Sequence, residues 1–372
     1  MVYLTSILFL LYAFLIWYYW HGWRSLKETS ITNNSNHYTT ISVIIPARNE
    51  AENILRLLQS LKDQDYPQEY VEIILIDDFS TDKTSSLASS FPMSNLYVIN
   101  PKQHAKQSSK KSAIEAGIKA SSGELIITTD ADCIPPTTWL KSIHQFYLET
   151  NSEMIAAPVK MKYGNSLLDK FQALDFLTLQ GITGGSVQSD LHVMCNGANL
   201  AYSRKAFMNV NGFKGVDHVA SGDDLLLMYK IKQKYPGQVQ FLKNKQAIVQ
   251  TLPQTGIRGF FNQRKRWASK TFAYKERILI AILAFVYLFN CFLFGVMVAG
   301  FYNPTYWLTA LILIILKTII ELPFLYTVAN YYNEKKLLKY FIFFQPFHIF
   351  YTVITGIISQ TSQYSWKERK LN

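Results

Sequence analysis

Three long stretches of this 372-residue chain contain no Lys, Arg, Asp or Glu. They are residues 1–20, 278–316 and 340–366, whereas residues 24–277 carry charges as an ordinary globular sequence does. The charged fraction of the whole chain is 17%, below the typical fraction of about a quarter in soluble domains. A helix needs about 20 apolar residues to cross a hydrocarbon core of about 30 Å. The pattern predicts membrane helices on both sides of a soluble middle, and it excludes a plain soluble enzyme, a disordered protein and a small secreted scaffold.

The first stretch is predicted to be a retained membrane anchor, residues 1–23. No Lys or Arg precedes the apolar run and no small-x-small cleavage site follows it, which argues against a secretory signal. Aromatic residues gather at its end, followed by Arg24 and Lys27. Because basic residues concentrate on the cytoplasmic side of membrane spans, this end is expected to lie in the cytoplasm.

Residues 278–362 are predicted to form a C-terminal membrane region. Asn303-Pro304 supplies a turn that would separate spans near 278–300 and 305–328. The last stretch, 340–362, has basic residues beyond both of its ends and a proline inside it. It is therefore expected to be either a third span of this region or a re-entrant segment.

Lys317 and Glu321 lie four residues apart within the second of these spans. That spacing places both side chains on one helix face. Because an unpaired charge in lipid is costly, a structural ion pair is favoured over a functional site.

From residue 41, short β-branched runs alternate with segments of helical periodicity. The predicted strands are 41–45, 71–76, 96–99 and 125–129, and the predicted helices are 54–61, 82–90, 110–120 and 136–149. This alternation predicts an α/β domain over residues 40–255, with a mostly parallel sheet flanked by helices. Ligands of such sheets bind at the carboxyl ends of the strands, so the polar residues that follow each strand are candidates for a site.

Acidic residues stand at three such positions. They are Asp77 and Asp78, Asp130 and Asp132, and Asp223 and Asp224. Each group taken alone also fits a helix N-cap or a solvated turn. Paired carboxylates at buried strand ends repel one another, and a divalent cation removes that repulsion. Oxygen ligands without Cys or His suit Mg²⁺ or Mn²⁺ and argue against zinc.

The acids belong to an ordered set of motifs. The set comprises Ile41-Ser-Val-Ile-Ile-Pro-Ala-Arg-Asn-Glu50, Ile76-Asp-Asp-Phe-Ser-Thr-Asp82, Lys111-Ser-Ala-Ile, Thr129-Asp-Ala-Asp132, Asn196-Gly-Ala-Asn199, Ser221-Gly-Asp-Asp224 and Gln263-Arg-Lys-Arg-Trp267. It resembles the family 2 glycosyltransferases, which have the GT-A fold, over roughly residues 40–275. The Gln-x-x-Arg-Trp motif, within a predicted interfacial segment 256–277, is typical of membrane-embedded members such as cellulose and hyaluronan synthases and the ceramide glucosyltransferases.

The resemblance implies a nucleotide-sugar donor, by default a UDP-sugar. The residues that it assigns to the nucleoside are Pro46, Glu50 and Asp77 or Asp78. Asp130 also contacts the donor and, with Asp132, would bind the Mg²⁺ or Mn²⁺ that bridges the diphosphate and stabilises the charge of the leaving group. Lys111 would add a positive charge near the phosphates, although without the resemblance it equally fits a solvated helix lysine.

The resemblance also implies a general base, Asp224. A hydroxyl acceptor is a poor nucleophile until its proton is removed, so a carboxylate on the acceptor side is required for direct displacement. Family members of this kind invert the anomeric centre in one step. Asp223 stands where Glu is commoner in the family. It is expected to assist Asp224 without contacting the substrate itself.

In the last motif the resemblance gives donor contacts to Gln263, Arg266 and Trp267, with Arg266 as a phosphate clamp and Trp267 also as a wall of the acceptor pocket. The alternative is a purely positive-inside flank, which would comprise Arg258, Arg264, Lys265, Arg266, Lys270, Lys275 and Arg277. That alternative explains the charge and not the spacing of the motif. We expect it to hold for most of the other basic residues.

The sequence thus predicts a multi-pass protein of the cell membrane, with a cytoplasmic domain that transfers a sugar to a lipid-linked or membrane-presented acceptor. Alternatives are a processive polysaccharide synthase, which needs more spans for a polymer channel, and a catalytically inactive scaffold or small transporter. The 3 cysteines follow no Cys-x-x-Cys pattern and indicate free thiols in a reducing cytosol. No nucleic-acid module is visible in the sequence, and the net charge of +11 is better explained by the flanks of the membrane segments than by binding to DNA.

Overall fold

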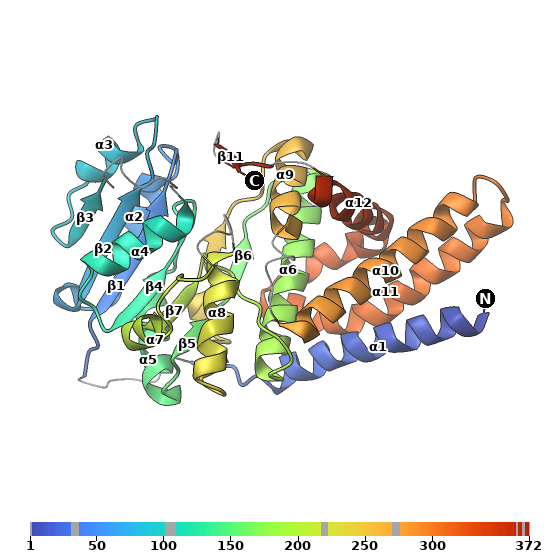
Figure 1. Cartoon of the computed structure of the whole chain (residues 1–372), viewed down its shortest axis with the longest axis horizontal. Helices are drawn as coiled ribbons and strands as arrows, with labels where there is room; N and C mark the ends of the chain where they lie inside the picture. Colours follow the sequence, from blue (N-terminus) through green and yellow to red (C-terminus); the bar gives the residue numbers. More distant parts are fainter. Residues whose placement is uncertain are drawn as a thin grey trace. The chain divides into compact units, whose positions relative to one another are not determined.

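The chain forms two compact units, each with its own core, in a computed structural model (Figure 1). The structure describes residues 2–30, 37–100, 109–216, 222–269, 276–361, 364–366 and 369–371. The sheet unit comprises residues 27–162 and 193–252. The helical unit comprises residues 1–26, 163–192 and 253–372.

The sheet unit is built on a seven-stranded sheet with the strand order β3-β2-β1-β4-β7-β5-β8. Its strands are β1 (Ile41–Ala47), β2 (Val71–Asp77), β3 (Leu96–Ile99), β4 (Leu125–Thr128), β5 (Met154–Ala156), β7 (Leu200–Ser203) and β8 (Val239–Phe241). The neighbours β3, β2, β1 and β4 are parallel, β7 is antiparallel to both β4 and β5, and β8 is parallel to β5. A second small sheet pairs β6 (Val159–Met161) with β9 (Val249–Thr251) in parallel. The predicted mostly parallel sheet is confirmed.

Helices flank this sheet. They are α2 (Ile54–Lys62), α3 (Thr84–Ser89), α4 (Lys110–Ala120), α5 (Trp139–Thr150), α7 (Arg204–Asn209) and α8 (Asp223–Lys234), with short 3-10 helices η1 (Gln68–Tyr70) and η2 (Lys245–Ala247). Close packing explains one of their small residues. A Cβ added to Gly117 of α4 would lie 2.5 Å from Cδ1 of Ile76 and 2.8 Å from Cγ2 of Ile44. Only glycine lets α4 approach β1 and β2 this closely.

Helix α5 begins at Trp139, later than the predicted residue 136. Ile134 exchanges backbone hydrogen bonds with Gln250 and is therefore extended. Pro135 favours the same extended conformation in the residue before it, so the chain turns helical only beyond the second proline, Pro136.

His144 of α5 provides a pH-dependent contribution to the stability of the sheet unit. Its Nε2 accepts the backbone N–H of Thr39 at 3.2 Å, which requires the neutral ring. Burial lowers the pKa of His144 below its usual value, and the nearby His37 adds to that shift. The unfolded chain therefore binds more protons below a pH of about 6.5, and folding stability falls as the pH drops through that value.

We expect His144→Gln to flatten this acid dependence. The melting temperature of the wild-type protein should fall more between pH 7.5 and 5.5 than that of the variant, because the variant has no proton to take up there. Thermal melts of both proteins in matched buffers measure the difference. Equal slopes for the two proteins would exclude His144 as the cause.

The helical unit contains the long apolar helices. Its elements are α1 (Val2–Ser25), α6 (Leu167–Gln188), α9 (Gly256–Ser269), α10 (Arg277–Ala299), α11 (Thr305–Tyr331), η4 (Lys335–Tyr340) and α12 (Phe341–Thr361), followed by the antiparallel strands β10 (Tyr364–Trp366) and β11 (Arg369–Leu371). Four described segments are long and apolar enough to cross a membrane, namely 3–25, 277–299, 305–331 and 335–359. Helix α12 continues through Pro346 without a break, which favours the third span over the re-entrant alternative.

Helix α6 was not predicted, and it packs closely against α1. A Cβ on Gly185 would lie 2.5 Å from the carbonyl oxygen of Tyr19, and a Cβ on Gly22 would lie 2.3 Å from the carbonyl oxygen of Gly185. Small residues at these positions bring the two backbones together, as they do between membrane helices. The sequence analysis placed residues 163–192 within the domain 40–255, whereas here this segment packs in the helical unit.

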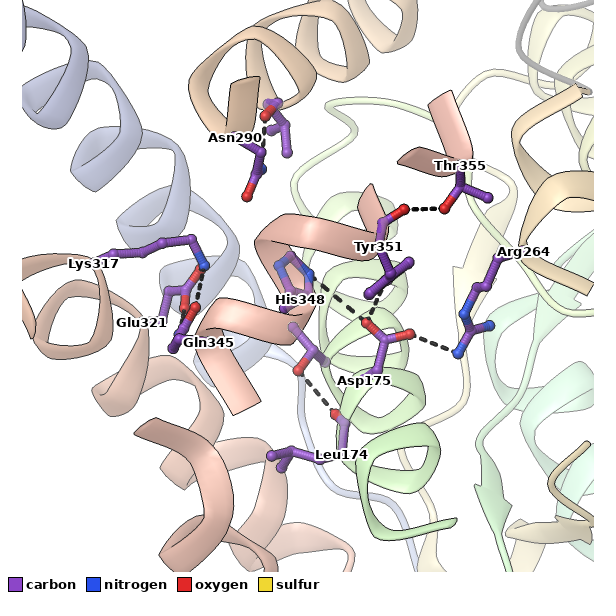
Figure 2. Close-up of polar contacts among 12 residues, drawn as sticks. Leu174, Asp175, Arg264, Asn290, Lys317, Glu321, Gln345, His348, Tyr351 and Thr355 are labelled. Carbon is purple, nitrogen blue, oxygen red and sulfur yellow. Dashed lines mark hydrogen bonds and ion pairs between the residues drawn. The ribbon is translucent and has the colours of Figure 1, made fainter. Parts of the chain in front are cut away.

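The predicted ion pair between Lys317 and Glu321 is present. Lys317 Nζ lies 2.7 Å from Glu321 Oε1 and also donates to Gln345 Oε1 of α12 at 2.7 Å (Figure 2). Glu321 further accepts hydrogen bonds from Gln345 Nε2 at 2.5 Å and from the Tyr12 hydroxyl of α1. The pair therefore joins three of the candidate spans, with the Lys317 side chain only 1% exposed.

Lys317→Met is expected to destabilise the helical unit by about 3 kcal/mol, because it leaves the buried Glu321 carboxylate without its cation. Adding Glu321→Met to that variant should recover most of the loss, since a buried ion pair is often replaceable by apolar residues. Unfolding of the detergent-solubilised protein measures both effects. A double variant as unstable as the single one would contradict this explanation.

Candidate active site

The segments that follow β1 and β2 lie side by side at one edge of the sheet. Ala47 pairs with Asp77, and the backbone N–H of Asp78 donates to the carbonyl of Ala47 at 2.7 Å. Pro46 is the last residue before this pair in β1, opposite Ile76. The strand register thus brings the first two motifs together.

Hydrogen bonds fix this double loop. Arg48 Nη1 donates to the carbonyls of Asp78 at 2.8 Å and Phe79 at 2.6 Å, and Phe79 has a left-handed φ of +57°. The backbone N–H of Glu50 donates to Thr84 Oγ1 at 2.7 Å. Arg48 has no role in the sequence analysis, yet it ties the turn after β2 to the end of β1.

Three carboxylates of this loop pair are largely buried. Glu50, Asp77 and Asp78 are 8%, 7% and 3% exposed. Glu50 Oε2 accepts a hydrogen bond from Asn53 Nδ2 at 2.7 Å, and Asp77 Oδ1 accepts one from the backbone N–H of Ser80 at 3.3 Å. These contacts hold acceptor oxygens in fixed positions, which suits recognition of the donor groups of a nucleoside.

Asp130 and Asp132 follow β4 on the other side of β1. Thr129 donates its backbone N–H to the Ile44 carbonyl at 3.3 Å, which continues the sheet up to the first of these acids. A turn then begins, closed by a hydrogen bond from the Cys133 N–H to the Asp130 carbonyl at 3.1 Å. Both aspartates are partly exposed at this edge.

Asp223 and Asp224 form the first turn of α8, where a carboxylate is favoured by the helix dipole. The backbone N–H of Gly197 donates to Asp224 Oδ2 at 3.1 Å, and the N–H of Leu225 donates to Oδ1 at 2.9 Å. The Asp224 carboxylate is therefore oriented by two backbone donors.

Lys110 joins the acids of β4 to those of α8. Its Nζ lies 2.5 Å from Asp130 Oδ1 and 3.9 Å from Asp223 Oδ2. Burial by itself lowers the pKa of Lys110, but the charges of Asp130 and Asp223 outweigh it and raise the pKa above its usual value. A Cβ on Gly197 would lie 3.4 Å from Lys110 Nζ and 3.6 Å from Asp223 Oδ2. The two acidic motifs therefore converge on one cation beside Gly197.

Lys111, the lysine that the sequence analysis assigned to the phosphates, points elsewhere. It is 2% exposed, and its Nζ donates to the carbonyl of Val216 at 2.7 Å. It is therefore not the solvated lysine of the alternative interpretation either. Its neighbour Lys110 is the lysine that contacts the acidic residues.

The Gln-x-x-Arg-Trp motif lies on α9 in the helical unit. Gln263, Arg266 and Trp267 are each partly exposed. Arg264 is one of the basic residues named in the positive-inside alternative. Its side chain is 4% exposed and forms an ion pair with Asp175 of α6 at 2.7 Å, so it is not a solvated flanking cation (Figure 2). Asp175 is missing from the sequence analysis because it stands outside every motif.

Comparison with known proteins shows which family resembles the first part of the chain. Residues 42–210 match the model of the family described as "Glycosyl transferase family 2". These residues are similar to the glycosyltransferase domain of that family. The match begins in β1 and ends just after α7, so this domain includes the acids that follow β1, β2 and β4.

The relatives of this chain include proteins named as glycosyltransferases. The chain is 32% identical over 127 residues to "Glycosyltransferase AglE" of Haloferax volcanii, which covers 34% of this chain and 41% of the relative. It is 24% identical over 288 residues to "Poly-beta-1,6-N-acetyl-D-glucosamine synthase" of Staphylococcus epidermidis, which covers 72% of this chain and 67% of the relative. The chain therefore spans only about two fifths of the length of the archaeal relative.

One solved structure shares the fold. The mannosyltransferase PcManGT from Pyrobaculum calidifontis, solved in complex with GDP-Man and Mn²⁺, aligns with 96% of this chain and 99% of its own length at a TM-score of 0.59. The identity is 18%, so the likeness establishes the fold. The GT-A type of the predicted fold is confirmed.

The acidic residues at this edge of the sheet are suited to a divalent cation that is also bound by the phosphates of a substrate. Among the described residues, no group of three or more His, Cys, Asp or Glu could hold a metal ion by itself. Asp130 and Asp132 supply two carboxylates, and Mg²⁺ is usually held by one or two carboxylates together with substrate phosphates. This donor set suits Mg²⁺ or Mn²⁺ and offers no soft ligand for zinc.

Cys133, next to Asp132, is an inert thiol. It is 1% exposed, and burial raises its pKa well above the usual value, as do the charges of Asp132 and Asp130. The thiolate is the nucleophilic form, so this cysteine is not set up for catalysis. All three cysteines are free thiols, as predicted.

Proposed function

We propose that the protein is a membrane-bound inverting glycosyltransferase. It transfers a sugar from a nucleotide-sugar, by default a UDP-sugar, to a lipid-linked or membrane-presented acceptor. The observation that carries the proposal is the convergence of Asp130, Asp223 and Asp224 around Lys110 at the edge of the sheet where ligands of α/β proteins bind. Paired carboxylates at that edge could bind a metal ion and act as a base, and the lysine beside them could bind a diphosphate.

In this proposal the loops after β1 and β2 bind the nucleoside. Pro46 shapes the end of the strand, and the carboxylates of Glu50, Asp77 and Asp78 accept hydrogen bonds from the base and the ribose. Asp130 and Asp132 would hold Mg²⁺ or Mn²⁺, which supplies charge stabilisation to the diphosphate leaving group. The nucleoside site then lies at the ends of β2 and β1, and the diphosphate site lies at the end of β4.

Asp224 is the proposed general base. It would accept the proton of the acceptor hydroxyl while that oxygen attacks the anomeric carbon and the nucleoside diphosphate leaves. The Gly197 and Leu225 N–H groups orient its carboxylate. Asp223 precedes it in the first turn of α8 and, like Asp130, lies near the Lys110 ammonium group.

Lys110, in place of Lys111, is proposed as the lysine that faces the donor phosphates. Lys110→Met should lower kcat/KM for the donor by about 10- to 100-fold, because the site loses a cation and keeps its mutually repelling carboxylates. The matched control is Lys119→Met, a 70% exposed lysine of the same helix, which should leave kinetics unchanged. Steady-state kinetics compare the two, and equal effects would remove Lys110 from the donor site.

The Gln-x-x-Arg-Trp helix is proposed to contact the substrates. Gln263 and Arg266 would contact the donor, with Arg266 on its phosphates, and Trp267 would form a wall of the acceptor pocket. The partial exposure of all three side chains is compatible with ligand contact.

The four candidate spans support a multi-pass protein of the cell membrane. The positive residues Arg24, Lys335, Lys336 and Lys339 at the ends of these segments favour a cytoplasmic glycosyltransferase domain. A donor made in the cytosol and an acceptor presented by the bilayer would meet at that face.

A processive polysaccharide synthase is the second candidate function. The 72% of this chain that aligns with a polysaccharide synthase favours it. The small number of candidate spans argues against a polymer channel in a single chain. An inactive scaffold or transporter is disfavoured by the presence of every acidic motif.

The test is a product analysis. Membranes that contain the protein are incubated with a panel of radiolabelled sugar nucleotides, and the lipid and polymer products are separated. A single-sugar glycolipid is expected for one donor of the panel. A polymer ladder would support the synthase, and incorporation from none of the donors into either fraction would contradict transfer.

A further inference from the structure

A buried ion pair lies beside the Gln-x-x-Arg-Trp motif. Arg264 Nη2 of α9 lies 2.7 Å from Asp175 Oδ2 of α6, and the two side chains are 4% and 7% exposed (Figure 2). A buried pair of this kind adds little to stability over well-packed apolar residues, because desolvation of both charges offsets their attraction. The pair is therefore more informative for the side chains that it orients than for stability.

Arg264 contacts two of the three motif side chains. Its guanidinium lies 4.2 Å from the ring centre of Trp267, and its Nη1 lies 3.4 Å from Gln263 Oε1 as a donor. On its other side it lies 5.0 Å from the ring centre of Phe260. A planar guanidinium stacked on an aromatic ring fixes the orientation of that ring.

Asp175 is in turn held from α12. The Tyr351 hydroxyl donates to Asp175 Oδ1 at 2.8 Å, and His348 Nε2 lies 3.8 Å from the same oxygen (Figure 2). Asp175 therefore forms an ion pair with Arg264 of α9 and accepts a hydrogen bond from Tyr351 of α12.

Helix α6 also holds the chain just before α9 begins. Gln172, 0% exposed, donates its Nε2 to the Gln254 carbonyl at 3.0 Å, and its Oε1 accepts the Gln254 N–H at 3.0 Å. Gln172 stands one helical turn before Asp175. The start and the middle of α9 are thus both attached to one face of α6.

We infer that Asp175 and Arg264 are positioning residues for sugar transfer. The Asp175 carboxylate, oriented by Tyr351, holds the Arg264 guanidinium over the ring of Trp267 and beside Gln263, and this contact sets where the motif presents Trp267 and Arg266. The inference rests on the proposed role of this motif in transfer. Nothing in the pair touches substrate.

The test neutralises the pair without leaving a buried charge. Asp175→Asn with Arg264→Gln should lower kcat/KM for the acceptor by about 10- to 100-fold, the scale of a misplaced catalytic group. Calorimetric binding of the donor and the melting temperature should stay close to the wild-type values. Arg264→Lys should lose as much transfer, because an ammonium keeps the charge and cannot stack as a planar group.

Two further variants separate positioning from general stability. Lys317→Met with Glu321→Met removes another buried pair of the same unit, which contacts Tyr12 of α1 and Gln345 of α12, and transfer should stay within about threefold of wild type. Tyr351→Phe keeps the ion pair and removes one hydrogen bond, so its loss should lie between those of wild type and the Asp175 and Arg264 double variant.

The outcomes distinguish the inference from the function on which it rests. Full transfer by Arg264→Lys, together with inactive Arg266→Gln and Trp267→Ala, would overturn the positioning role alone. Full transfer by Arg266→Gln and Trp267→Ala would instead overturn the role of the motif. A loss in the Lys317 and Glu321 double variant as large as in the Asp175 and Arg264 double variant would assign the effect to stability.

Discussion

Asp224→Asn is expected to abolish sugar transfer while leaving donor binding intact. Asn keeps an oxygen that can accept the Gly197 N–H, so the start of α8 should keep its structure. It cannot accept a proton from the acceptor hydroxyl, and loss of a general base costs about 10²- to 10⁴-fold in rate. Transfer assays in purified membranes and calorimetry with the donor measure the two properties separately.

The matched control for this substitution is Asp65→Asn. Asp65 belongs to the same unit, is 60% exposed and forms a surface ion pair with Lys141 at 2.8 Å. Such pairs contribute little, so transfer should be unchanged. Full transfer by Asp224→Asn would remove Asp224 from the mechanism.

Asp132→Ala is expected to remove metal-dependent donor binding. Only two carboxylates, Asp130 and Asp132, are assigned to the cation, so the loss of one should weaken donor binding by at least about 10-fold in Mn²⁺. Calorimetric titration of the donor, with Mn²⁺ and with chelator, measures the effect without depending on activity. The wild-type protein should bind more tightly in Mn²⁺, and the variant should show no such difference.

Unchanged donor binding by Asp132→Ala in Mn²⁺ would refute its role in metal binding. Asp63→Ala serves as the control, because Asp63 lies in the sheet unit at the end of α2, where its carboxylate accepts two exposed hydrogen bonds from Gln59 Nε2. Its donor binding should equal that of the wild-type protein in both conditions.

The fold near the acids could be predicted because it depends on local pattern. The buried strands β1, β2 and β4 are short β-branched runs, and acids directly follow two of them. The parallel order of a βαβ fold then brings those ends to one edge of the sheet. The spacing of Lys317 and Glu321 was sufficient to predict their ion pair, because residues four apart share a helix face.

The choice between Lys110 and Lys111 could not be predicted. Both lie in the first turn of α4, and residues buried later in this helix fall at helical spacing from each of them. Adjacent residues differ in direction by about 100° around a helix, and the sequence does not say which direction faces the acids. The tertiary position of Val216, which accepts from Lys111, decides it.

Helix α6 and the burial of Arg264 depend on contacts far apart in the chain. Helix α6 is buried on several faces, so it lacks the single apolar stripe that reveals a surface helix. Arg264 looks like a flanking cation because its partner Asp175 lies in a distant segment without any motif. Such pairs become visible only when the helices are packed.

The central claim is that sugar transfer occurs by one displacement, with Asp224 as the base. The anomeric configuration of the product tests it most directly. Nuclear magnetic resonance of the purified glycolipid, compared with the donor, reports that configuration through the coupling constant of the anomeric proton. The proposed mechanism predicts a product whose anomeric configuration is opposite to that of the donor. A product with retained configuration would contradict it.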